Sequence, residues 1–134
     1  LRRVVRRQRL RWIRDRLFKR RWGGAMRQTG VLTAMCLYAL DHNVARLEDD
    51  HALALRIGNG LRELPMVEHM LPIDTNIVIF DVATTGPTAR QIAALLKQQD
   101  IVITVVGAYR LRVVTHMDVG NKDGDLLIEA FRKI

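Results

Sequence analysis

The amino-acid sequence predicts an α/β domain in which helices cover a small sheet, preceded by a strongly basic arm. Three observations support this prediction. Segments with helical spacing alternate with short β-branched runs, 49% of the 134 residues are hydrophobic, and most of the positive charge lies at one end of the chain. A chain of this length has room for one domain with its own core.

The basic arm is defined by its charge. Residues 1–27 hold 12 arginines and lysines and a single acid, Asp15, whereas the rest of the chain carries a net charge of −3. The apolar side chains of residues 1–22 fall on no single helical face, which argues against an amphipathic membrane helix. We therefore treat residues 1–22 as an arginine-rich arm and residues 23–134 as a separate α/β domain.

Two helices are expected after the small residues that follow the arm. Residues 28–40 are apolar nearly all round, which indicates a helix buried against a partner subunit or a further domain. From Val44 to Pro65 apolar residues recur every three or four positions, which predicts an amphipathic helix. We interpret Gly58 and Gly60 as the terminus of that helix, because the third glycine of a dinucleotide-binding loop is absent.

The remaining elements are four strands and two helices. Between the second and third strands, Thr85, Gly86 and Pro87 predict a helix start with the proline at the first helical position. A last helix is expected from Asn121 to Ile134. The strands are predicted where short runs rich in β-branched residues occur, at residues 66–70, 76–82, 101–106 and 110–116.

Several classes of protein are excluded by composition. The single cysteine, Cys36, excludes an intrachain disulfide framework and a thiolate metal cluster, and the four histidines show no ligand spacing, so we expect no metal site. No apolar run approaches the roughly 18 residues that a membrane span requires. Leu1 in place of methionine indicates part of a longer chain, and a cytoplasmic location is expected.

Two sets of arginines are candidate binding residues. Period-two alternation in residues 110–116 places Arg110 and Arg112 on one face of a strand, where a guanidinium forms either a structural ion pair or a two-point contact with a substrate carboxylate. Arg27 follows a glycine-rich turn at the start of a helix. That turn is either a phosphate-binding backbone or a simple connection between helices.

Three blocks of the sequence together resemble a known family. They occur in the family's order and near its spacing, and they read GGAMRQTGVLTAMCLYALDHNVARLEDDH at 23–51, TNIVIFDV at 75–82 and LRVVTHMDV at 111–119. These blocks resemble the C-terminal part of the pyridoxal-phosphate-dependent threonine aldolases of the β-eliminating lyase family. The resemblance covers roughly residues 20–134, and residues 1–19 match the family poorly.

The resemblance implies the C-terminal small domain of a fold-type-I, pyridoxal-phosphate-dependent enzyme that is a homodimer or homotetramer at full length. Such enzymes cleave threonine or allo-threonine to glycine and an aldehyde. Arg112 matches the arginine of the family's V-R-L-V-T-H block, which implies that it binds the substrate carboxylate. Arg27 matches the arginine of G-G-G-M-R-Q, and Arg20 stands where the family usually has lysine. Both are implied to reach the cofactor phosphate, including that of a neighbouring subunit.

The chain also departs from the family. None of its four lysines, Lys19, Lys97, Lys122 and Lys133, lies in the family's Schiff-base motif. The resemblance therefore implies no catalytic residue in this chain, which we expect to be inactive alone. The alternative is a non-enzymatic module whose basic arm binds nucleic acid or acidic partners through phosphate contacts, and elsewhere we expect no nucleic-acid binding.

Overall fold

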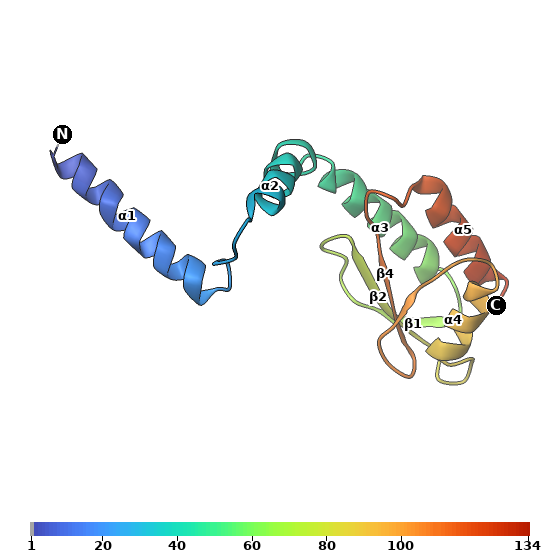
Figure 1. The fold of residues 1–134 in the computed structure, drawn as a ribbon. Helices are drawn as coiled ribbons and strands as arrows, with labels where there is room; N and C mark the ends of the chain where they lie inside the picture. The colour runs from blue at the N-terminus through green and yellow to red at the C-terminus, as the bar shows by residue number, and fades with distance from the viewer. Residues whose placement is uncertain (1) are drawn as a thin grey trace. The chain divides into compact units, whose positions relative to one another are not determined.

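The computed structural model describes the backbone of residues 2–134 and the side chains of residues 11–134. The chain divides into two compact units, Leu1–His42 and Asn43–Ile134 (Figure 1). The first unit contains helices α1 (Arg2–Arg21) and α2 (Gly30–His42), and the second contains three helices and a four-stranded sheet. In the part of the chain that the structure describes, no helix is long and apolar enough to cross a membrane.

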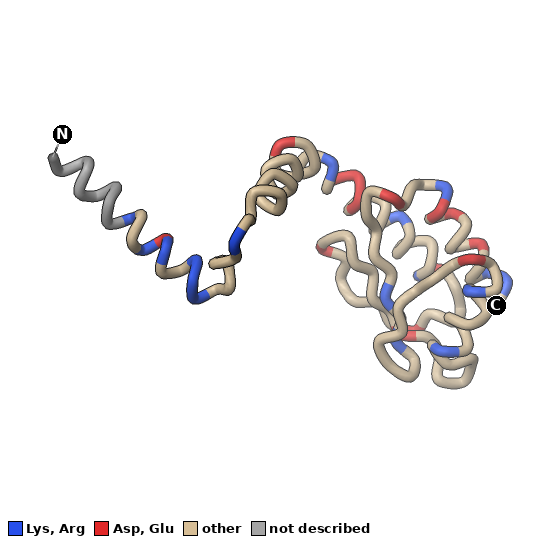
Figure 2. Tube along the Cα trace, in the orientation of Figure 1, with Lys and Arg blue, Asp and Glu red and all other residues tan. Residues whose placement is uncertain are grey.

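Helix α1 is an element that the analysis of the sequence did not include. Its apolar residues do not align on one face, but arginine and leucine have high helix propensity and neither glycine nor proline precedes Gly23. The helix ends at a glycine turn in which Gly23 has a φ of 75° and the Gly24 N–H donates to the Lys19 carbonyl at 2.8 Å. Figure 2 shows the basic residues along the C-terminal half of α1.

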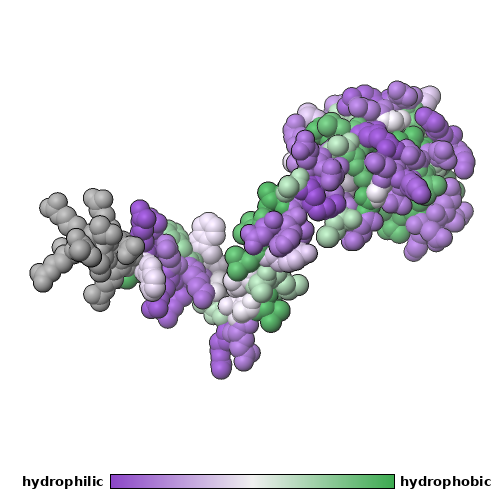
Figure 3. Space-filling model, turned by 90° about the horizontal axis from the view of Figure 1, so that it is seen from above, coloured by the Kyte–Doolittle hydropathy of each residue, from purple (hydrophilic) through white to green (hydrophobic). Residues whose placement is uncertain are grey.

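Helix α2 confirms the predicted helix but has no buried residue. Its large apolar side chains are all at least 50% exposed: Val31, Leu32, Met35, Leu37, Tyr38 and Leu40. The surface over this helix is accordingly hydrophobic in Figure 3. Burial of α2 against a partner subunit or a further domain stays a prediction.

The second unit is an antiparallel sheet with helices packed against it. The chain runs through α3 (Leu47–Arg62), β1 (Val67–Met70), β2 (Ile77–Val82), α4 (Ala89–Lys97), β3 (Thr104–Val105), β4 (Arg110–Val114) and α5 (Asn121–Arg132). The strand order is β1-β2-β4-β3, so α4 and β3 separate the two central strands in the sequence. This arrangement confirms the predicted small sheet with helices.

The core forms between the helices and one face of the sheet. Phe80 of β2 and Phe131 of α5 lie edge to face with ring centroids 5.7 Å apart. Around them are buried residues from every helix of the unit and from the two central strands: Leu53, Ile57, Leu61, Val78, Val82, Ile92, Leu96, Leu111 and Leu127. Burying a leucine or phenylalanine contributes roughly 1.5–3 kcal/mol, so this cluster is the main source of stability of the unit.

The glycines of α3 correct one interpretation of the sequence. Gly58 and Gly60 do not terminate the helix, which continues to Arg62. They instead permit close packing: a Cβ on Gly60 would lie 2.6 Å from Cδ1 of Ile128 in α5, and one on Gly58 would collide with Cδ1 of Ile73. Close contacts with α5 at Gly60 and with the loop between β1 and β2 at Gly58 therefore determine these glycines, and a single sequence does not reveal these contacts.

Two further corrections concern α4 and the strand after it. Thr88, not Pro87, precedes the helix as its N-cap, with reciprocal hydrogen bonds between Thr88 and Gln91. The predicted strand at 101–106 is reduced to Thr104–Val105. The reason is that Asp100, at a φ of 59°, ends α4 and the Ile101 N–H is donated to the Leu96 carbonyl instead of to a neighbouring strand.

A buried threonine ties the end of β4 to the start of α3. The side-chain hydroxyl of Thr115, which is fully buried, donates to the Asp50 carbonyl at 2.6 Å. The Thr115 N–H donates to the Asn76 carbonyl, and the Asn76 side-chain amide donates to the Thr115 carbonyl at 2.7 Å. These bonds fix the chain immediately after the exposed arginines of β4.

We predict that Thr115→Val lowers the free energy of unfolding by about 1–3 kcal/mol, because valine keeps the volume but leaves the buried Asp50 carbonyl without this donor. Urea denaturation followed by circular dichroism measures the change. Thr115→Ser keeps the hydroxyl and is expected to lose less stability. Equal losses in the two variants would contradict a role for the hydrogen bond.

Candidate functional site

The candidate site lies on the face of the sheet that the helices leave uncovered. In β2 and β4 alternate residues enter the core, and the residues between them point to the opposite face. Helices α3, α4 and α5 pack on the core side (Figure 1). The uncovered face therefore presents these side chains of β2 and β4: Ile77, Ile79, Asp81, Arg110, Arg112 and Val114.

The two arginines of β4 have different surroundings. Arg110 lies directly opposite Asp81 of β2 and donates from Nε and Nη2 to the two carboxylate oxygens, at 2.7 Å each. This is a two-point, charge-assisted ion pair. Of the two alternatives that the sequence left open, the structural ion pair applies to Arg110.

The hydrogen bonds between Arg110 and Asp81 shift the pKa of both side chains. Hydrogen bonding from Arg110 is the main cause that holds the pKa of Asp81 below its usual value, against a smaller opposing effect of burial, and the charge of His69 adds to the lowering. His69 lies opposite Asp81 on β1. The carboxylate in turn raises the pKa of Arg110. Asp81 is therefore ionised and occupied by Arg110 at neutral pH.

Arg112 is exposed, and the residues directly opposite it in the sheet are uncharged. It lies opposite Ile79 of β2 on one side and Thr104 of β3 on the other. No hydrogen bond or ion pair with another of residues 11–134 engages its guanidinium. Its planar fork of donors has no partner among these residues, and binding of a substrate carboxylate, the second of the two alternatives, stays a prediction for Arg112.

The other candidate residues belong to the first unit. Arg20 lines an open hollow of about 590 Å³ together with Arg16 and Lys19, and the rest of its lining is apolar: Ile13, Leu17 and Ala25. Arg27 is exposed in the turn before α2, and the next residue, Gln28, has a left-handed φ of 56°. Arg27 is not among the residues that line the hollow. Phosphate binding by Arg20 and Arg27 stays a prediction.

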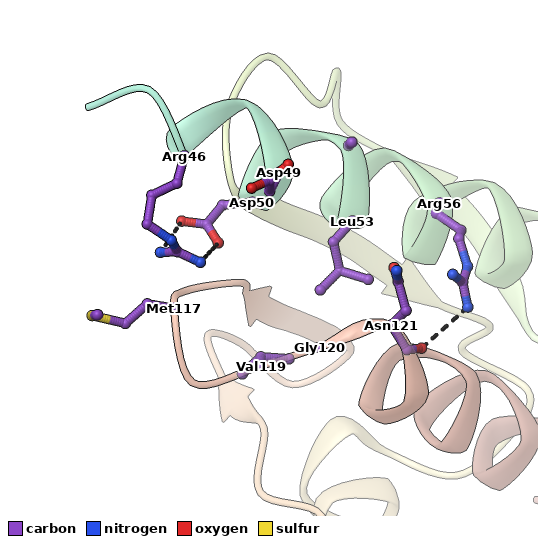
Figure 4. A pocket seen from close by; sticks show the side chains of 10 residues that line it. Arg46, Asp49, Asp50, Leu53, Arg56, Met117, Val119, Gly120 and Asn121 are labelled. Atoms are coloured by element: carbon purple, nitrogen blue, oxygen red, sulfur yellow. Dashed lines mark hydrogen bonds and ion pairs between the residues drawn. The ribbon is translucent and has the colours of Figure 1, made fainter. Parts of the chain in front are cut away.

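A second hollow, of about 420 Å³, lies between α3 and the segment that leads into α5 (Figure 4). Two arginines line it, but both are engaged. Arg46 forms an ion pair with the buried carboxylate of Asp50 at 3.4 Å, and Arg56 binds Asp125 and the Asn121 carbonyl. Because these charges are compensated inside the protein, the hollow has no free cation for an anionic ligand.

The structure also locates the residues considered for metal binding. Within residues 11–134, no three histidine, cysteine, aspartate or glutamate side chains converge in a way that could hold a metal ion. Cys36 is exposed on α2, the helix for which the sequence predicts burial against a partner subunit or a further domain. None of the residues of α2 is buried in the described part of the chain.

Two residues of this region were missed in the sequence. Asp81 is an acid within an apolar strand. Its role follows from its position opposite Arg110, which is known only once the pairing of β2 with β4 is known. Thr115 reads as an ordinary β-branched residue, and only the structure shows that its hydroxyl bridges to α3. Neither residue has a spacing pattern that identifies it without the fold.

Comparison with known proteins identifies the family. The sequence profile described as beta-eliminating lyase matches residues 8–85, more than half of the chain. This chain belongs to the beta-eliminating lyase family. The resemblance read from the sequence is therefore confirmed.

Curated relatives give the same result. The chain is 32% identical over 126 residues to the probable low-specificity L-threonine aldolase 2 of Arabidopsis thaliana, covering 92% of this chain and 34% of the relative. It is 36% identical over 100 residues to the low specificity L-threonine aldolase of Escherichia coli K12, covering 75% of this chain and 28% of the relative. The chain thus spans about a third of the length of these relatives.

Solved structures support the fold. An ornithine aminotransferase from Plasmodium yoelii and the ornithine δ-aminotransferase of Plasmodium falciparum each superpose with a TM-score of 0.52, at 12% and 11% identity. Each match covers 66% of this chain and about a quarter of the other. At this identity they report the fold alone, and they confirm the predicted α/β small domain of a fold-type-I enzyme.

We predict that the ionised Asp81 carboxylate contributes to the stability of the fold and that this contribution is lost in acid. Because its folded-state pKa is lowered, this contribution is complete above about pH 4, the unfolded value, and disappears as the pH falls through the folded value. Urea denaturation from neutral pH down to about pH 3 should therefore show a shrinking difference between the wild type and Asp81→Asn.

Asp74→Asn removes an exposed carboxylate on the loop before β2 and is the matched control. Its difference from the wild type is expected to be small at every pH. A constant difference for Asp81→Asn across the range would contradict the assigned pKa direction.

Proposed function

We propose that this chain is the C-terminal part of a pyridoxal-phosphate-dependent, threonine-aldolase-like lyase that cleaves a β-hydroxy-α-amino acid to glycine and an aldehyde. The observation that carries the proposal is the free guanidinium of Arg112 on the uncovered face of the sheet, at the position that matches the family's carboxylate-binding arginine. Membership of the beta-eliminating lyase family and the names of its curated relatives support it.

Arg112 is suited to orienting an amino-acid substrate. Its fork of donors forms two parallel hydrogen bonds with a carboxylate, and this fixes the plane of the ligand as well as its position. The residue lies within a strand whose neighbours on both sides are hydrogen-bonded, so its backbone is held more rigidly than in a loop. Holding the carboxylate in one orientation directs the bond to be cleaved toward the reacting centre.

Pyridoxal phosphate, when bound, accepts the electron pair released at the substrate's Cα. The chain offers groups for its phosphate but no enclosed lysine. The hollow of α1 is lined on one side by Arg16, Lys19 and Arg20. Three positive charges on one face of a helix fit a dianionic phosphate. Lys97, Lys122 and Lys133 are exposed on or beside helices of the second unit. We infer that the lysine that binds the cofactor lies in the length of the relatives that this chain does not span.

Assembly and location form part of the same proposal. A largely apolar, exposed helix such as α2 is expected to be covered by the rest of the enzyme or by another subunit of a homodimer or homotetramer. The single free cysteine is compatible with a reducing compartment such as the cytoplasm. Binding of nucleic acid or acidic partners through the exposed arginine and lysine side chains of α1 stays the alternative prediction.

We predict that the purified 134-residue chain, incubated with pyridoxal phosphate, develops no absorption band of a cofactor bound to lysine and releases no glycine from threonine. The reason is that none of its lysines lies in the family's cofactor-binding motif. Absorption spectroscopy and an amino-acid assay measure the two properties. Robust glycine release would mean that one of the four lysines of this chain binds the cofactor in place of the lysine of the family motif.

The second prediction concerns Arg112 and uses a chimaera in which this chain replaces the corresponding part of the E. coli relative. Arg112→Lys keeps the charge and loses the two-point contact, so kcat/KM for threonine should fall by roughly ten- to a hundredfold. The absorption of the bound cofactor should stay unchanged. Steady-state kinetics and the absorption spectrum of the same preparation measure both effects.

Arg90→Lys is the matched control, because Arg90 is an exposed arginine on α4, away from the uncovered face. It is expected to leave kcat/KM as it is. If Arg112→Lys behaves like Arg90→Lys, or if it unfolds the protein, the carboxylate role of Arg112 is wrong.

A further inference from the structure

The uncovered face carries one acid close to the free arginine. Asp81 is the single acid of β2 and β4, and its side chain points to the same face as Arg112. Asp81 is directly opposite Arg110 and therefore diagonal to Arg112, two residues along β4. Diagonal neighbours of this kind have Cβ atoms roughly 7–8 Å apart or less, which the long side chain of an arginine can bridge. Asp81 is thus a built-in competitor for any carboxylate that Arg112 binds.

We propose that Arg110 is a positioning residue that keeps Arg112 available for the substrate by occupying both oxygens of the Asp81 carboxylate. This inference rests on the proposed function, and it adds a residue that sets the affinity of the same site. In the structure, both Asp81 oxygens accept hydrogen bonds from Arg110 at 2.7 Å, while Arg112 faces the uncharged Ile79 and Thr104.

Geometry explains why Arg110 wins this competition in the native chain. Directly opposite residues in an antiparallel pair are closer than diagonal ones, so Arg110 reaches Asp81 in the fork-to-carboxylate arrangement without extending across the strand. A carboxylate that accepts both hydrogen bonds of a fork has little remaining attraction for a second guanidinium. Removing Arg110 releases the carboxylate, and the nearest arginine on that face of β4 is then Arg112.

The charges of β2 and β4 on the uncovered face are unbalanced. On β2 and β4 this face carries Arg110 and Arg112 against the single acid Asp81, so these two strands keep one uncompensated positive charge after the ion pair forms. An anionic ligand therefore meets one guanidinium that is neutralised and one that is not. Selectivity for a ligand with one carboxylate at this position follows from that difference.

The first experiment uses the 134-residue chain itself and follows the Asp81 carboxyl carbon by NMR as the pH is varied. In Arg112→Gln the pKa of Asp81 should equal that of the wild type, because Arg110 still holds the carboxylate. In Arg110→Gln it should stay below its usual value, because Arg112 takes over. In Arg110→Gln with Arg112→Gln it should rise, with only His69 left to lower it. If Arg110→Gln alone raises the pKa as far as the double variant, Arg112 does not capture Asp81 and the proposal is overturned.

The second experiment measures the consequence for substrate in the chimaera. Arg110→Gln should raise KM for threonine about two- to fivefold, the range that exposed ion pairs of this kind contribute, with kcat nearly unchanged. Adding Asp81→Asn to Arg110→Gln removes the competitor and should restore the wild-type KM. Arg110→Lys, which can still pair with Asp81, should show the smaller change of the two Arg110 variants.

The outcomes separate this proposal from the proposed function. If Arg112→Lys impairs the enzyme but Arg110→Gln leaves KM unchanged, the carboxylate role stands and the role of Arg110 is wrong. If Arg110→Gln raises KM and Asp81→Asn does not restore it, Arg110 acts on the substrate or the fold directly, which also overturns the proposal. If Arg112→Lys has no effect while the NMR result is as expected, the proposed function fails and the competition for Asp81 remains.

Discussion

The alternation of β2 and β4 between a buried and an exposed face is the constraint on which the rest of the second unit depends. Val78, Phe80 and Leu111 enter the core, and the strand geometry then forces Asp81, Arg110 and Arg112 onto the other side of the sheet. A shift of one residue in the register would exchange the two sets and bury the charges. The apolar core that stabilises the unit therefore also determines where its candidate binding groups lie.

The hydrogen bonds of Thr115 extend this constraint into the loop after β4. By joining the end of the strand to Asp50 of α3 and to Asn76, they prevent the uncovered face from shifting relative to the helices behind it. Core packing on the opposite side of the sheet and buried hydrogen bonds after the end of β4 thus hold the exposed face in place. A binding group on such a support keeps its orientation without needing contacts of its own.

The sequence predicts the central strands, the amphipathic helices and the face shared by Arg110 and Arg112, because these depend on local periodicity. It does not predict which arginine is paired, since that depends on the register of two strands more than 25 residues apart. Gly60 and Asp100 illustrate the same limit: one is determined by the approach of Ile128, and the other by how α4 ends. Helix α1 has no periodic apolar face, and it forms because arginine and leucine have high helix propensity.

The strands at the two margins of the sheet restrict how another protein chain could join it. β3 pairs over two residues only. β1 has an irregular register between Val67 and His69, and its two middle residues are exposed. Short or bulged margins offer few free backbone groups in a row, so the sheet is poorly suited to being lengthened by an added strand or to stacking into ordered aggregates.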